Sequence, residues 1–204
     1  MKKVIVLFFI IVICSFRIDA QTIRVNNGFL ITSLNSSNYD ILNNHLISYT
    51  SSIGLDYLHR PYFSVSSEIG YTKIGGSDKI FIQSDVNTKK HITIKEKKDY
   101  LQLNTTFRIK MPLGYNYLYM GIGPNISLLL NNNKFSNLNF SGYKLSQFLY
   151  GIKSEIGANV NLKDKFVVGL NAAYFRNVNN YAESELNNMK NSIFSFTFMI
   201  GYEL

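Results

Sequence analysis

Residues 99–130 read DYLQLNTTFRIKMPLGYNYLYMGIGPNISLLL, two alternating segments joined by a short turn. In the first segment Leu101 and Leu103 share one face and Gln102 and Arg108 fall on the other, because successive side chains of an extended chain point to opposite faces. The second segment repeats this pattern, with glycines and polar residues opposite a continuous apolar face. The stretch therefore predicts a β-hairpin whose apolar face packs on a second sheet or turns towards lipid.

Composition favours strands over membrane helices. The chain has 204 residues, enough for one domain with a sizeable interior. It contains 14 Tyr and 15 Phe, which strands favour, and its mean hydropathy is near zero, which is too polar for a bundle of membrane helices. The single Cys excludes a disulfide within the chain.

The N-terminus has the layout of a secretory signal peptide. Two lysines precede an apolar run over residues 4–14, and a more polar segment ends at Ala20. The run is too short to span a bilayer as a helix. We predict that residues 1–20 are a signal peptide cleaved after Ala20. Acylation of Cys14, as in a lipoprotein, is the less favoured alternative, because Ile13 stands where a small residue is expected.

Alternation recurs through the rest of the chain, and the segments predict eight strands. They cover residues 24–33, 46–58, 63–72, 101–110, 117–130, 145–160, 166–174 and 194–204. The interval from 75 to 98 carries alternating isoleucines on both sides of a polar tip. We predict a hairpin there that continues the flanking strands beyond the sheet.

Long and short intervals alternate between these strands, and this asymmetry indicates a membrane barrel. Up-and-down transmembrane barrels have short turns on the periplasmic side and long loops outside, an even strand count, and both termini on the short-turn side. A soluble sandwich or lipocalin gives the asymmetry no cause. We therefore predict an all-β fold, an eight-stranded antiparallel up-and-down transmembrane β-barrel, for a single outer-membrane domain over residues 21–204.

Aromatic residues gather near the predicted strand ends, where the interfacial girdles of such a barrel lie. The candidates are Tyr57, Tyr62, Phe63, Tyr71, Tyr100, Tyr115, Tyr117, Tyr174 and Tyr202.

Several short motifs occur in a fixed order along the chain. They are Asp99-Tyr100-Leu101, Met111-Pro112, Gly121-Ile122-Gly123-Pro124-Asn125, the glycines Gly151 and Gly157, and Gly201-Tyr202. In this series the chain resembles the porin-T-like outer-membrane β-barrel domain family of Gram-negative bacteria, over essentially its whole mature length. The resemblance implies a barrel of about eight strands, inserted by the barrel-assembly machinery and without catalytic residues. The chain departs from the family in ending on Leu204 rather than on an aromatic residue.

Charged side chains fall on the predicted inner face. They are Glu68, Arg108, Lys153 and Glu155, with Asp56 and Lys110 nearer the short turns. Eight strands enclose a lumen just wide enough for side chains to fill, and an unpaired charge there is costly. We therefore predict that the first four form a structural ion-pair network. A gated narrow path for ions or protons is the alternative.

The inner face also carries a Gly121-Ile122-Gly123 motif. It lacks the strand-to-helix context of a phosphate-binding loop, so we attribute the inward glycines to crowding in the lumen. Pro124 cannot donate a ladder hydrogen bond, which predicts a local bulge.

Catalytic, cofactor and metal sites are not expected. His45, His59 and His91 lie in or beside predicted connections, without metal-ligand spacing. A lipid-modifying barrel enzyme would need a histidine with a serine and a carboxylate on one rim, and His45 with Ser36 or Ser37 is the candidate pair.

These features predict a non-enzymatic integral outer-membrane barrel that anchors and displays surface loops. The expected partners are outer-membrane lipid including lipopolysaccharide, whose phosphates the cluster Lys89, Lys90, His91, Lys95, Lys97 and Lys98 would face, the barrel-assembly machinery, and an envelope protein bound through the outer loops. Nucleic acid is not expected as a partner of an exported chain. The alternatives are a narrow porin-like channel for small solutes or ions, the barrel enzyme, and a soluble periplasmic barrel.

Overall fold

The computed structural model describes residues 20–36, 42–58, 60–85, 88–130, 144–162, 165–183 and 188–204. Its ten strands are β1 (Ala20–Ser36), β2 (Leu46–Tyr57), β3 (Phe63–Asp85), β4 (Thr88–Leu113), β5 (Asn116–Leu129), β6 (Lys144–Leu145), β7 (Phe148–Asn161), β8 (Phe166–Asn177), β9 (Ala182–Glu183) and β10 (Asn188–Glu203). Within the described ranges no helix is long and apolar enough to span a membrane. The predicted signal peptide lies outside them, apart from Ala20.

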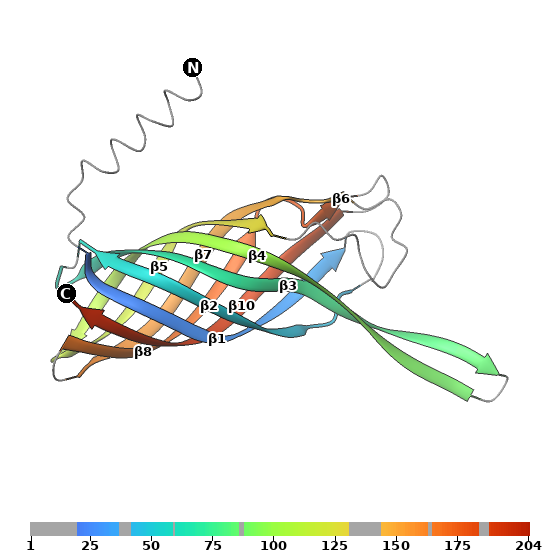
Figure 1. Cartoon of the computed structure of the whole chain (residues 1–204), viewed down its shortest axis with the longest axis horizontal. Helices are drawn as coiled ribbons and strands as arrows, with labels where there is room; N and C mark the ends of the chain where they lie inside the picture. The colour runs from blue at the N-terminus through green and yellow to red at the C-terminus, as the bar shows by residue number, and fades with distance from the viewer. Residues whose placement is uncertain are drawn as a thin grey trace, which may run out of the picture.

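Eight of the strands form a closed antiparallel ring (Figure 1). Their order is β1, β2, β3, β4, β5, β7, β8 and β10, and β10 pairs with β1 to close the ring. The closing ladder runs from Thr22 opposite Glu203 to Ser36 opposite Met189, so the ring has no free edge along it. The predicted fold class, an eight-stranded antiparallel transmembrane β-barrel, is confirmed.

Three connections at one end of the barrel are short. They comprise residues 58–62, 114–115 and 162–165. Gly114 adopts the left-handed region, with φ of 66°, which glycine allows without a steric penalty. β1 begins and β10 ends at this same end (Figure 1). We call it the short-turn end, and we call the opposite end the loop end.

β3 and β4 extend beyond the ring as a long hairpin. Their ladder runs from Phe63 opposite Ile109 to Asp85 opposite Thr88. β2 covers β3 only as far as Thr72, and β5 covers β4 over a similar length. The outer part of the two strands therefore projects from the loop end as a ribbon (Figure 1). This confirms the predicted continuation of the flanking strands into a hairpin.

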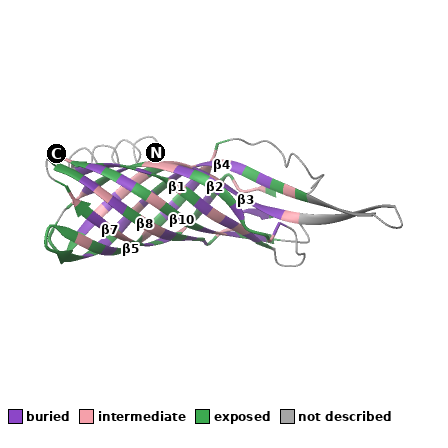
Figure 2. Cartoon of the chain, turned by 90° about the horizontal axis from the view of Figure 1, so that it is seen from below, coloured by how far each residue is buried: buried purple, intermediate pink, exposed green. Residues whose placement is uncertain are grey.

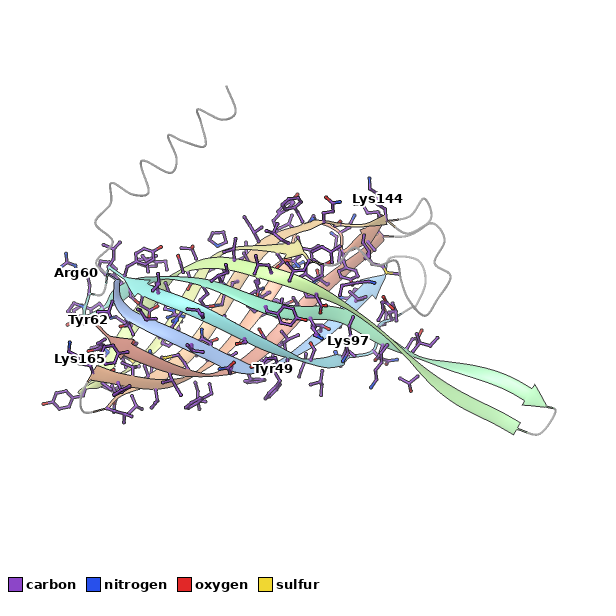
Figure 3. The ribbon with its side chains drawn as sticks, in the orientation of Figure 1. Tyr49, Arg60, Tyr62, Lys97, Lys144 and Lys165 are labelled. Atoms are coloured by element: carbon purple, nitrogen blue, oxygen red, sulfur yellow. The ribbon has the colours of Figure 1, made fainter. Side chains whose placement is uncertain are left out.

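Side chains alternate between an exposed outer face and a buried lumen (Figure 2). The outer face is apolar around the ring, and the side chains of Ile47 and Leu170 are 66% and 65% exposed. Tyr49 points away from the barrel, and the charged Arg60 and Lys165 mark its short-turn end (Figure 3). An exposed apolar belt of this extent is the surface that a bilayer covers.

Two aromatic residues expected in the girdles turn into the lumen instead. Tyr100 is fully buried, because it shares the face of Gln102 two positions further on. Tyr117 accepts a hydrogen bond from Asn159 Nδ2 at 2.7 Å. For these two side chains, the alternation of faces along the strand predicts the orientation correctly, whereas their location near a strand end does not.

The predicted bulge at Pro124 is wrong. The β4–β5 register is the same before and after it, with Asn104 opposite Asn125 and Phe107 opposite Ile122. On its other side Pro124 lies opposite Ile152 of β7 without a register shift. The missing N–H interrupts the ladder locally and inserts no residue.

The last predicted strand is longer than expected, because β10 begins at Asn188. The preceding polar interval contains β9, which pairs with β10 through Ala182 opposite Met189 and with β6 through Glu183 opposite Lys144. β6 and β9 therefore extend the wall at the loop end.

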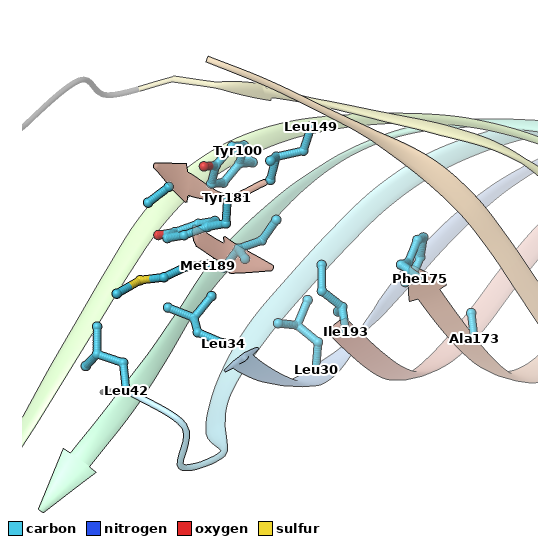
Figure 4. Close-up of a cluster of buried hydrophobic side chains, with 12 residues drawn as sticks. Leu30, Leu34, Leu42, Tyr100, Leu149, Ala173, Phe175, Tyr181, Met189 and Ile193 are labelled. Carbon is cyan, nitrogen blue, oxygen red and sulfur yellow. The ribbon is translucent and has the colours of Figure 1, made fainter. Parts of the chain in front are cut away.

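Apolar side chains fill the lumen at the loop end (Figure 4). This loop-end cluster consists of Leu30, Leu34, Leu42, Ile74, Tyr100, Leu149, Ala173, Phe175, Tyr181, Ala182, Met189 and Ile193. Most members come from inward positions of the ring strands, whereas Leu42 and Tyr181 belong to connections that enter the lumen. The rings of Tyr100 and Tyr181 lie 6.3 Å apart.

Candidate functional site

Six charged side chains from five strands meet in the lumen on the short-turn side of the loop-end cluster. This ion-pair layer consists of Arg24 from β1, Asp56 from β2, Glu68 from β3, Arg108 from β4, and Lys153 and Glu155 from β7. Each side chain is at most 10% exposed. Three cations face three carboxylates, so the layer is neutral as a whole.

The two arginines link β1 to β4 across the lumen. Arg24 binds Asp56, with Nη1 3.1 Å from Oδ1, and also binds Glu68. Arg108 Nη1 lies 3.2 Å from the same Asp56 oxygen, and its Nε donates to Glu155. Because each arginine contacts more than one carboxylate, loss of either arginine removes several ion pairs at once.

Lys153 completes the layer from the opposite wall. Its Nζ lies 2.8 Å from Glu68 Oε2 and 2.8 Å from Glu155 Oε2, and it donates to Asn104 Oδ1 at 3.2 Å. Asn171 Nδ2 also donates to Glu155, at 3.1 Å. Every carboxylate of the layer thus has a cationic partner.

Two glycines make room for the arginines. Gly54 lies between Arg24 and Glu68 in the strand register, and a Cβ there would be 2.6 Å from Arg24 Nε. Gly121 lies between Arg108 and Glu155, and its Cβ would be 3.0 Å from Arg108 Cγ. The sequence predicts that inward glycines relieve crowding in the lumen. At Gly54 and Gly121, the side chains that need this space are those of the ion pairs.

The structure brings together the four residues of the predicted network, Glu68, Arg108, Lys153 and Glu155, and adds Asp56 to them. It also adds Arg24 of β1, which is not among the predicted members of the network. The signal for Arg24 is its alternation with Val25, which faces outwards. Lys110 is separate, with its Nζ 5.1 Å from the Tyr117 ring centre.

A small cavity lies beside the ion-pair layer, towards the loop end. Its volume is about 30 Å³, and its lining includes Glu68, Lys153, Asn104, Leu30 and Phe175. This is room for about two water molecules. The cavity thus separates a charged floor from the apolar cluster, and it is too small for a solute.

The residues considered for a barrel enzyme do not form a described site. His45 is exposed, and its backbone carbonyl accepts from Ser77 Oγ at 3.1 Å. Ser37 and His59 lie outside the described residues, as do the side chains of Ser36 and His91. Across the described ranges no group of three His, Cys, Asp or Glu side chains could hold a metal ion.

The basic cluster expected at the outer rim is divided. Lys95 and Lys97 are exposed, whereas Lys98 is buried and lies 2.9 Å from Glu96. The side chains of Lys89 and Lys90 lie outside the described part. Lys98 is therefore unavailable to a ligand at the rim.

No protein-family model and no curated protein sequence matches the chain. The porin-T-like resemblance therefore stays a prediction. Among solved structures, the outer membrane protein OprG from Pseudomonas aeruginosa is similar with a TM-score of 0.55 and 14% identity, over 91% of this chain and 96% of that one. Neisserial surface protein A is similar with a TM-score of 0.52 and 8% identity, over 89% and 97%. This chain has the fold of outer-membrane β-barrels.

Proposed function

We propose that this chain is a non-enzymatic integral protein of the outer membrane of a Gram-negative bacterium, which anchors and displays its loop-end elements at the cell surface. The barrel provides the anchor, and the projecting β3–β4 hairpin and the longer connections provide the displayed surface. We propose export through a cleaved signal peptide and insertion by the barrel-assembly machinery.

The filled lumen carries this proposal. The ion-pair layer joins five strands across the barrel, and a cavity of about 30 Å³ separates it from the loop-end cluster. A solute channel needs a continuous wet path, whereas these two layers occupy the lumen with paired charges and then with apolar side chains. A closed, cross-braced barrel suits an anchor.

The displayed surface is where we propose that an envelope protein binds. The β3–β4 ribbon leaves the ring beyond Thr72 and so extends past the membrane-facing wall (Figure 1). A two-stranded ribbon is marginally stable alone in water, so a partner that pairs with or packs on it would stabilise it.

Conductance and fractionation test the proposal together. We expect a heat-modifiable band in the outer-membrane fraction, because a closed barrel resists detergent until it is boiled, and no unitary current in planar bilayers. Current steps whose ion selectivity changes in Lys153→Met, but not in the short-turn control Lys165→Met, would establish a lumen channel instead. A band recovered without detergent, with unchanged mobility, would contradict the outer-membrane position.

A further inference from the structure

The barrel wall has a window at the loop end, between β8 and β10. β8 pairs with β10 as far as Arg176 opposite Ser192. The next partner of β10 on this side is β9, which begins opposite Met189. In the described chain, Lys190 and Asn191 therefore have no strand partner on this side.

The window is built into the backbone, because the chain that leaves β8 stays with β7. Val178 N donates to the Tyr150 carbonyl at 2.8 Å. The Asn179 side chain then replaces a strand partner: its Oδ1 accepts from Tyr150 N at 2.9 Å, and its Nδ2 donates to the Phe148 carbonyl at 2.6 Å. The path towards β9 therefore turns away from β10 before it returns to it.

A cavity of about 750 Å³ occupies the window. Its lining includes two cations, Arg176 and Lys190, the phenol ring of Tyr174, and five asparagines, and none of the lining residues is a carboxylate. Cavities of a few hundred to about 1,000 Å³ hold small organic ligands. The lining therefore suits an anion with several oxygen acceptors.

Both cations lie on the outer face and have no counter-ion among the residues that the structure describes. Arg176 and Lys190 are exposed, and neither forms an ion pair with a carboxylate of the described residues. Two positive charges that line one cavity repel each other. A bound phosphate would convert that repulsion into charge-assisted hydrogen bonds.

A buried amide in the same cavity lacks an acceptor. Asn191 is 3% exposed, and its Oδ1 accepts from Asn177 Nδ2 at 2.8 Å. Among the described residues, its Nδ2 has no hydrogen-bond partner. Buried donors are rarely left unpaired, because they have lost water without gaining an acceptor. An oxygen atom of a ligand in the window would satisfy this donor.

The apolar belt begins next to the window, on its short-turn side. Tyr174 of β8 lies opposite Phe194 of β10, and both side chains face outwards, 43% and 38% exposed. A ligand with its anionic group in the window would therefore have its apolar part beside these rings. This geometry selects an amphiphile over a free anion.

We propose that the window binds the phosphate-bearing headgroup of a lipid in the outer leaflet, such as lipopolysaccharide. Arg176 and Lys190 bind the phosphate, Asn191 Nδ2 donates to one of its oxygens, and the acyl chains lie along the belt near Tyr174. The inference rests on the outer-membrane position proposed above, and it adds a site that an anchor does not require.

Native mass spectrometry of the chain purified from membranes in zwitterionic detergent tests the site. The probes are lipopolysaccharide, dephosphorylated lipopolysaccharide and inorganic phosphate. We expect Arg176→Gln/Lys190→Gln to weaken lipopolysaccharide binding at least about tenfold, as the loss of charge-assisted bonds implies. The control Arg60→Gln/Lys165→Gln removes the same charge from the short-turn end and should change binding less than about twofold.

Asn191→Asp is the second variant, since it keeps the oxygen that Asn177 donates to and replaces the unpaired donor with an acceptor. It should also weaken binding, while boiling still shifts the band. Equal binding of the dephosphorylated lipid, or unchanged binding in both window variants, would overturn the proposal. Binding of inorganic phosphate as tight as that of the lipid would assign the site to the free ion. Binding is measured in detergent, so it does not depend on where the protein resides in the cell. Absence of the protein from the outer-membrane fraction would refute the proposed anchor function without deciding whether the window binds lipid.

Discussion

The two halves of the lumen are filled in different ways. Near the short turns, six charged side chains form the ion-pair layer, and near the loops, twelve apolar and aromatic residues form the loop-end cluster. Both sets come mainly from inward positions of the same strands, so the backbone does not distinguish them. The charged half is bound by directional contacts between strands, and the apolar half by packing.

This difference predicts different responses to substitution. Desolvation of buried charges offsets much of their mutual attraction, so an intact ion pair adds little net stability, whereas a charge left without its partner is severely destabilising. An apolar side chain contributes through the area and volume that it fills. The cost of truncating it is therefore set by the cavity that is left, and not by the loss of one particular partner. The comparison can therefore be tested one residue at a time.

Arg108→Met should have the largest effect. It removes one cationic partner from each of Asp56 and Glu155 and leaves three buried carboxylates facing two cations, while keeping the bulk of the side chain. It should lower the free energy of unfolding by about 4 kcal/mol. Urea unfolding in phospholipid vesicles, followed by gel mobility without boiling, measures this change. The exposed control Lys165→Met should change stability by less than about 0.5 kcal/mol.

The double variant Arg108→Met/Glu155→Leu tests the cause. It removes one charge of each sign, so it should be more stable than Arg108→Met alone, since Asp56 and Glu68 keep Arg24 and Lys153 as partners. If the loss of stability in the double variant equals the sum of the losses in the two single variants, the ion-pair layer stabilises the barrel by packing, as the loop-end cluster does.

Leu149→Ala should have the next largest effect. Leu149 is fully buried in the loop-end cluster, and the cavity left by its side chain should cost about 3 kcal/mol in the same unfolding assay. The exposed Leu162, in a short turn, supplies the matched control, whose change to Ala should cost less than about 1 kcal/mol. Equal losses of unfolding free energy at the two positions would mean that packing in the loop-end cluster does not stabilise the barrel more than an exposed turn residue does.

Gly54→Ala should cost about 2 kcal/mol, because the new Cβ would lie 2.6 Å from Arg24 Nε and force the ion pairs to shift. Gly201→Ala is the control, since the nearest atom there is a Thr22 methyl group at 3.1 Å that can move more freely. A larger loss of stability in Gly201→Ala than in Gly54→Ala would contradict the idea that Gly54 is needed to make room for the Arg24 side chain.

Tyr181→Phe should have the smallest effect at neutral pH, within about 0.5 kcal/mol. The Tyr181 hydroxyl is buried and has no hydrogen-bond partner within the described part of the chain, so its removal leaves no donor or acceptor unpaired. Tyr181 lies outside the membrane-spanning strands, and burial raises its pKa well above the ordinary value of 10.

The raised pKa also predicts a pH dependence. Below pH about 10 the phenol is neutral in both states and its stability contribution is fully present; as the pH rises further, only the unfolded state ionises and stability falls. Unfolding measured between neutral and alkaline pH should show a weaker decline in Tyr181→Phe than in the unchanged chain. Identical declines would place the Tyr181 phenol in contact with water.

Several features of the fold could be predicted because they are local. The period of two assigns each strand residue to a face, so the inward positions of Arg108 and Glu155 follow from the alternation of their own strands. The same rule places Leu30, Leu149 and Phe175 inside, and their apolar character was the available signal for the loop-end cluster.

Other features depend on where distant strands meet. Arg24 reaches Asp56 and Glu68 because the register of β1 on β2 sets it opposite Gly54, and Gly54 lies opposite Glu68 of β3. The window between β8 and β10 depends on the path of the chain between two strands. Contacts of this kind follow from register and barrel curvature, which no single segment contains.

The sequence by itself determined the alternation of faces, the asymmetry of the connections and therefore the transmembrane barrel, since these properties arise from neighbouring residues. Only the tertiary structure decided which inward charges pair, that the other half of the lumen is apolar, and that the wall opens beside Arg176 and Lys190. These outcomes depend on the closure of the ring, which brings residues far apart in the chain to within a few ångströms of each other.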